Sequence, residues 1–418
     1  MSRRRQGQKA VAGVVLAGLV AVLSGCATSP APPATAAAET VSVPKAGSGV
    51  MSIYAAVNLD GAGANPSLAD AMQLAIEQAG GEVDNIPVRF VLLDETNTSG
   101  TPDDAAVAAA ARAAAADSST VAFVGPDTSG DTAIMLPILN RAGILEVSPT
   151  ATYGGLTRTS SDPDEPAKYY PSGRRTFGRV VPADAAQAAA QANYEHTAGC
   201  THVFVLDDGS LYGRGLAASF ASDASAAALT VAGRRVISTG AKQYTQIAAT
   251  AAGSADCVLF VGELTAGVTT LFDELHAAGP NLKLFGTDTL ASAAFAASLG
   301  SAQSVTYLTG PTLDPSYYGD SGQAFYESYA IRFGGPPDSS AIFGYEAMNA
   351  VLSAIRTAGS RNREAIVDAF FNINDRASPL GTYSIDAEGD TTLNRYGGYR
   401  VVDSGLQFDM VLPTTVKP

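Results

Sequence analysis

Short apolar runs alternate with amphipathic or alanine-rich stretches along most of the chain. Buried strands are expected at 51–57, 88–93, 121–124 and 144–147. Helices are expected between them, over about 67–79, 103–116 and 130–141. Ser67 is the expected N-cap of the first helix, and Gly80 follows its end. Alternation at this spacing indicates a parallel sheet with helices on both faces.

The same alternation of apolar runs and amphipathic stretches begins again after Pro182. Strands are expected at 203–206, 231–237, 257–261, 283–285 and 305–308. Helices are expected over about 183–197, 213–227, 244–253 and 266–278. Two sheets of similar make-up predict two lobes, and a ligand would bind where the carboxyl ends of the strands meet. The segment 159–175 is rich in polar residues and proline, so we expect a surface loop there.

The composition is that of a globular protein with room for two lobes. The chain has 418 residues, of which 46% are hydrophobic and 16% are charged. Its net charge of −14 argues against nucleic acid and against an anionic membrane surface as partners. Tryptophan is absent, so any aromatic contact with a ligand must come from tyrosine or phenylalanine.

The N-terminus has the pattern of an export signal. A basic segment precedes the apolar residues 10–22, which are too few to span a bilayer comfortably. Small residues then lead to Cys26, and this looks like a bacterial lipoprotein signal with residues 1–25 removed and a lipid on Cys26. An ordinary secretory signal or an uncleaved anchor helix is the alternative. Residues 26–48 are rich in Ala, Pro, Thr and Ser, which predicts a flexible tether.

The patterns of common enzyme sites are incomplete or absent. Gly61 and Gly63 follow the first strand, but Pro66 stands where a dinucleotide-binding fingerprint has its third glycine. The sequence has no Gly-x-Ser-x-Gly elbow and no Gly-x-x-x-x-Gly-Lys-Ser/Thr loop. Its three histidines, His196, His202 and His276, lack the spacing of a zinc site. We therefore expect no catalytic residue, no metal and no cofactor.

Four stretches in order resemble type I periplasmic binding proteins, in the leucine/isoleucine/valine-binding branch of the amino-acid and amide group. They are Phe123–Ser129, Ala142–Thr152, Val205–Gly213, and Ser378–Thr382 with Asp386–Asp390. The resemblance extends from about residue 49 to 415. It implies an α/β fold of two doubly wound, Rossmann-like lobes, joined by a hinge at which the chain crosses three times. Lobe one would be 49–181 plus 312–381, and lobe two 182–311 plus 382–418.

The resemblance also implies ligand-binding residues in lobe one. Ser129 follows a strand and opens a helix, where free N–H groups favour an anion such as the carboxylate of an amino acid. The alternative is that Ser129 only caps this helix. Thr150 and Ala151 would offer mainly backbone groups, and Thr152 its N–H and hydroxyl. Ordinary turn chemistry is the alternative for Thr152.

Three residues of lobe two are candidates by the same resemblance. Tyr212 would close over the ligand, or else it is a core tyrosine. Asp288 matches the position whose carboxylate receives the ammonium group of the ligand, and a solvated turn aspartate is the alternative. Glu263 is a second acidic candidate. Leu264 and Thr265 follow it where the reference branch has aromatic residues, so a branched-chain preference does not carry over.

Cys200 and Cys257 precede the first and third strands of lobe two. In a doubly wound sheet these strands are neighbours, and both cysteines lie at the end away from the ligand. We therefore expect a disulfide, which suits an exported protein. Two buried thiols are the alternative.

The resemblance implies a solute-binding lipoprotein of an ABC uptake transporter, outside the cytoplasm and held to the membrane by its lipid. It would bind an amino acid or a derivative, close by hinge motion and dock as a monomer on a membrane permease. It would not be an enzyme. A ligand sensor of the same fold, signalling to a partner protein, is the alternative.

Overall fold

The structure, a computed structural model, describes residues 49–59, 64–96 and 103–416. The expected signal, the lipidated Cys26 and the tether lie outside the described residues. One sheet has the strand order β2-β3-β1-β4-β5-β6. Its strands are β1 (Met51–Val57), β2 (Glu82–Val83), β3 (Ile86–Asp94), β4 (Thr120–Val124), β5 (Leu145–Ser148) and β6 (Phe177–Arg179). All its pairings are parallel except β2 with β3.

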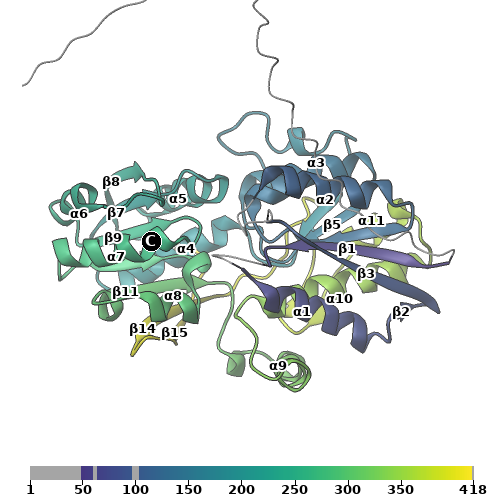
Figure 1. Cartoon of the computed structure of the whole chain (residues 1–418). Coiled ribbons are helices and arrows are strands. Elements are labelled where there is room, and N and C mark those ends of the chain that lie inside the picture. Colours follow the sequence, from purple (N-terminus) through teal and green to yellow (C-terminus); the bar gives the residue numbers. More distant parts are fainter. Residues whose placement is uncertain (1–48, 60–63, 97–102, 417–418) are drawn as a thin grey trace, which may run out of the picture. The chain divides into compact units, whose positions relative to one another are not determined.

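Helices cover both faces of the first sheet (Figure 1). Their bounds are α1 (Pro66–Gln78), α2 (Asp104–Ala116), α3 (Ser129–Arg141) and α10 (Ala341–Ala358). Alternate residues of β1 point to opposite faces: Ile53 packs in the core with α1 and α10, whereas Tyr54 packs in the core with α2 and α3. A strand buried on both faces has to be apolar throughout, which is why the run 51–57 was recognisable.

The second sheet has the order β15-β14-β11-β10-β9-β7-β8. Its strands are β7 (His202–Asp207), β8 (Thr230–Val236), β9 (Cys257–Val261), β10 (Lys283–Gly286), β11 (Thr306–Gly310), β14 (Tyr396–Val402) and β15 (Gly405–Leu412). Helices α4 (Asp184–Thr197) and α5 (Leu211–Asp223) pack on one face. Helices α6 (Thr245–Ala252), α7 (Ala266–Ala278) and α8 (Ala293–Ser298) pack on the other.

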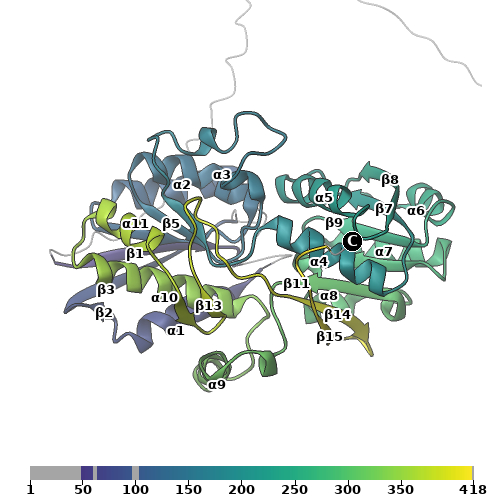
Figure 2. The ribbon, with the colours of Figure 1, turned by 180° about the vertical axis from the view of Figure 1, so that it is seen from behind.

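Within the described residues the chain passes between the two sheets three times (Figure 2). It leaves the first sheet after β6 and the second after β11. It then forms α9 (Asp320–Phe333), α10, α11 (Arg363–Phe371) and the small hairpin β12 (Arg376–Ser378) and β13 (Gly381–Tyr383). It returns to the second sheet as β14 and β15. This confirms the predicted two-lobed α/β fold, while the residue boundaries of the lobes stay predictions.

One local prediction was wrong, and a second was incomplete. Asn65, not Ser67, is the N-cap of α1, and Pro66 occupies the first turn, where its missing N–H costs nothing. The segment 159–175 is not simply a surface loop. It buries Glu165, whose carboxylate accepts 2.7 Å hydrogen bonds from the hydroxyls of Tyr153 and Tyr169. A carboxylate held by several donors can be buried, although its sequence context looked polar.

A disulfide joins Cys200 and Cys257, whose Cα atoms lie 5.8 Å apart. Strands β7 and β9 are parallel neighbours, with Val203 opposite Cys257. The bond therefore lies at the amino ends of these strands, away from their carboxyl ends. Among the described residues, no helix is both long and apolar enough to cross a membrane.

Replacing Glu146 by glutamine should remove a pH-dependent loss of stability. Glu146 in β5 is fully buried, and neither carboxylate oxygen has a hydrogen-bond partner in the described chain. Burial raises the pKa of this carboxyl well above its ordinary value of 4.5. The folded protein therefore keeps a proton that the unfolded chain releases above that pH. Stability should fall as the pH rises from there towards the folded pKa, by up to about 1.4 kcal/mol per pH unit.

Urea unfolding at pH 5 and pH 8 measures this effect. Relative to the wild type, the Glu146→Gln variant should be more stable at pH 8 than at pH 5. The same pH dependence in both proteins would contradict the assignment.

Candidate functional site

The site begins where β4 ends and α3 begins. Gly125 has a φ of +111°, and a Cβ there would lie 2.5 Å from the carbonyl oxygen of Ala56, so the chain can turn here only at a glycine. The hydroxyl of Thr128 caps α3 by accepting the N–H of Asp131 at 3.1 Å. Ser129 is therefore not the cap. Its buried hydroxyl instead accepts the N–H of Tyr153 at 3.1 Å.

The loop after β5 packs against this helix start through its own hydrogen bonds. Ser148 Oγ accepts the N–H groups of Thr150 and Ala151 at 3.3 and 2.9 Å. The hydroxyl of Thr150 donates to the carbonyl of Asp127 at 2.7 Å. The N–H groups of Thr150 and Ala151, which are among the backbone groups predicted to contact the ligand, thus already have a partner inside the protein. These residues shape the loop around Thr152.

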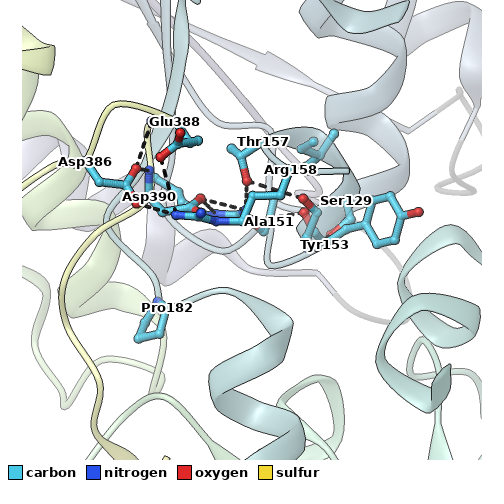
Figure 3. A network of polar contacts seen from close by, with 12 residues as sticks. Ser129, Ala151, Tyr153, Thr157, Arg158, Pro182, Asp386, Glu388 and Asp390 are labelled. Atoms are coloured by element: carbon cyan, nitrogen blue, oxygen red, sulfur yellow. Dashed lines mark hydrogen bonds and ion pairs between the residues drawn. The ribbon is translucent and has the colours of Figure 1, made fainter. Parts of the chain in front are cut away.

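A buried arginine, Arg179, donates hydrogen bonds to the backbone of the same loop. Arg179 Nη1 donates to the carbonyls of Ala151 and Tyr153 at 3.0 and 2.9 Å. Its Nε donates to Asp390 at 2.8 Å, and its Nη2 to the hydroxyl of Thr157 at 2.6 Å. Figure 3 shows Ala151, Tyr153, Thr157 and Asp390 in one network of polar contacts. The sequence analysis missed Arg179, although an arginine inside the short apolar run 177–181 was a usable signal.

Thr152 lies beside a buried acid from α4. Its carbonyl accepts the N–H of Asp184 at 2.9 Å. Burial raises the pKa of Asp184 to about 7; the Thr152 hydroxyl and the charge of Arg179 limit this rise, whereas Asp288 adds to it. Asp184 thus connects two candidate residues: it bonds to Thr152 of the loop after β5, and it lies within electrostatic range of Asp288, which follows β10 of the second sheet.

Asp288 is oriented by two neutral donors. Gln187 Nε2 donates to its Oδ1 at 2.7 Å, and the hydroxyl of Tyr212 also bonds to it. Burial raises the pKa of Asp288, and these two hydrogen bonds oppose the rise. Tyr212 itself is buried in the core with α4 and α5. Its hydroxyl positions Asp288, whereas its contact with a ligand stays a prediction; the sequence analysis did not foresee Gln187.

Glu263 follows β9 and lies in an acidic environment. Its N–H donates to Asp208 at 2.8 Å. Burial raises the pKa of Glu263 to about 8, and the charges of Asp208, Asp288, Asp127 and Asp131 add to this effect. The last two residues come from the start of α3. Acidic residues after β9 and β10 of the second sheet and around the start of α3 on the first sheet therefore lie close enough to influence one another.

Comparisons with known proteins agree with this fold. Residues 59–405 match the family model described as periplasmic binding protein. The Leu/Ile/Val-binding protein BraC3 of Rhizobium johnstonii is 26% identical over 279 residues, which are 66% of this chain and 72% of that protein. The leucine-binding protein LivK of Thermotoga maritima superposes with a TM-score of 0.77 at 22% identity, covering 87% of this chain and 99% of that one. The LivJ protein of Streptococcus pneumoniae, solved with isoleucine, has a TM-score of 0.74 at 20% identity and covers 88% and 100%.

Proposed function

Because this chain belongs to the periplasmic binding protein family, whose members are non-enzymatic solute receptors of ABC transporters, we propose that it captures an α-amino acid. The observation that carries the proposal is Asp288. This carboxylate lies at a strand end in the region where both lobes contribute residues, and its bonded partners are the neutral Gln187 and Tyr212. A partly buried carboxylate without a cationic partner is costly, and the ammonium group of a ligand would pair with it.

The other end of an amino acid suits the start of α3. Backbone N–H groups at a helix N-terminus favour a carboxylate, and the hydroxyl of Ser129 lies there. The N–H of Thr152 would add a donor from the neighbouring loop. The names of the Rhizobium and Thermotoga relatives, which bind branched-chain amino acids and leucine, support an amino acid as the ligand class.

We further propose that a lipid on Cys26 holds the protein at the outer face of the membrane and that the closed form docks on a permease. Both steps rest on the N-terminal sequence and the family. A sensor of the same fold would bind the same solute, so loss of solute uptake in cells lacking this protein favours transport.

Substituting Asp288 by asparagine should weaken amino-acid binding by about 10- to 100-fold, because a charge-assisted hydrogen bond to the ammonium is lost. Calorimetric titration of the purified full chain with a panel of L-amino acids measures this change. Asp320→Asn, an exposed aspartate of α9, is the matched control and should bind as the wild type does. Failure of every amino acid to bind, or unchanged affinity in the Asp288 variant, would refute the proposal.

A further inference from the structure

The site holds more acid than the single ammonium group of a neutral amino acid can use. Carboxylates gather after β3, at the start of α3, and after β7, β9 and β10; they are Asp94, Glu95, Asp127, Asp131, Asp208, Glu263 and Asp288. Among the described residues, none of these forms an ion pair with lysine, arginine or histidine. Backbone N–H groups satisfy Asp94 and Asp208. The hydroxyl of Thr128 donates to Asp131, and Gln187 and Tyr212 donate to Asp288. Glu95, Asp127 and Glu263 need a different explanation.

Glu95 has the largest desolvation cost of this set, because its carboxylate is buried and accepts no hydrogen bond within the described chain. Its side chain is 2% exposed, and neither of its carboxylate oxygens has a hydrogen-bond partner in the described chain. Oxygens of Glu95, Asp127 and Asp131 all lie within 4.8 Å of one another. One oxygen of Asp127 is also buried and unpartnered. Three carboxylates this close repel each other unless a proton or another cation lies among them.

The electrostatics of this cluster favour a cation among its carboxyl groups. Burial and the charges of Asp127 and Asp131 raise the pKa of Glu95 well above its ordinary value. Burial also raises the pKa of Asp131 to about 6, although the hydroxyl of Thr128 opposes this. A cation placed among these carboxyl groups would oppose both shifts. A branched apolar side chain directed here would leave these carboxyl groups buried and unpaired.

The position of the cluster relative to Asp288 suits one extended solute. The charges of Asp288, Asp127 and Asp131 all help to raise the pKa of Glu263, so Glu263 lies within electrostatic range of both acidic groups. Asp288 has its own donors, Gln187 and Tyr212, and does not share them with the cluster around Glu95. Asp288 and the cluster of Glu95, Asp127 and Asp131 are thus two separate anionic positions, and Glu263 is a third acid near both.

We propose that the solute carries a second cationic group, an ammonium or guanidinium, held by Glu95, Asp127 and Asp131 while Asp288 holds the first. This inference rests on the proposed function and specifies its ligand class: a basic amino acid or a related diamine. Carboxylates are the side chains that pair best with both kinds of cation, and a guanidinium can bond two of them at once.

The test is a calorimetric titration of the purified full chain with arginine, lysine, ornithine, putrescine, leucine, isoleucine and calcium chloride. A basic amino acid should bind at least about 10-fold more tightly than leucine, and Glu95→Gln and Asp127→Asn should each remove about 10- to 100-fold of that affinity. Glu327→Gln, an exposed glutamate of α9, is the matched control. Binding should also release protons, because a cation lowers the pKa of these carboxyl groups; titration in two buffers of different ionisation enthalpy detects this.

The outcomes separate the two proposals. Equal binding of leucine and lysine, with no effect of the Glu95 and Asp127 substitutions, overturns the proposal of a second cationic group. Such a result is still consistent with amino-acid capture. Binding of putrescine but of no amino acid supports the cationic site and overturns amino-acid capture. Calcium binding that depends on Glu95, with no basic solute bound, makes the cluster a metal site and overturns the inference. If no probe binds, both proposals fail.

Discussion

Replacing Arg179 by methionine should lower the free energy of unfolding by about 3–5 kcal/mol, because the buried Asp390 loses one of its two arginine partners and several buried acceptors lose their donor. Arg179 is fully buried, and its partner Asp390 is 6% exposed. The charge of Arg179 helps to hold the pKa of Asp390 below its ordinary value despite burial. The substitution also deprives the carbonyls of Ala151 and Tyr153 of a donor.

Chemical denaturation at neutral pH measures this loss. Arg158→Met is the matched control, because Arg158 donates to the same Asp390 at 2.8 Å but its side chain is 51% exposed. Solvent screens such a contact, so the control should lose no more than about 1 kcal/mol. Arg179→Lys should recover little, since one ammonium cannot reproduce the fork of a guanidinium. Equal losses in the Arg179 and Arg158 variants would show that the buried network is not specially stabilising.

The second large effect concerns the disulfide. Replacing both Cys200 and Cys257 by alanine should destabilise the protein by roughly 4 kcal/mol, which is the loop-closure entropy expected for a bond that spans 57 residues. Unfolding in the presence and absence of a reducing agent measures the same quantity on the wild type. The double variant is the control, because reductant should not shift its unfolding midpoint. A wild-type midpoint that reductant leaves unchanged would contradict the prediction.

The disulfide and the hydrogen bonds of Arg179 lie at different ends of their sheets. The disulfide secures the amino ends of β7 and β9, whereas Arg179 secures the loop that contains Ala151 and Thr152 at the carboxyl end of β5. We therefore expect the Arg179 substitution to weaken solute binding as well as stability. The disulfide substitution should affect mainly stability.

The strands buried on both faces were predictable from the sequence because burial demands an unbroken apolar run. Residues 257–261 were predicted as a strand with the bounds that the structure has, and β1 likewise. The hairpin of β14 and β15 was not predicted. Gly397 and Gly398 lower the strand propensity of β14, and β15 alternates with partly exposed positions.

The sequence also predicted candidate site residues from the ends of strands, since Ser129, Thr152, Glu263 and Asp288 each follow an apolar run. Only the tertiary structure decided what each one does. In the fold the hydroxyl of Ser129 accepts the N–H of Tyr153, and Tyr212 is buried beside Asp288. Glu95 from one loop lies close to Asp127 from another. Arg179 and Asp390 are 211 residues apart in the chain and hydrogen-bonded in the fold. Periodicity is a local property that each segment carries by itself, whereas pairing and burial of charge depend on which segments the fold places together.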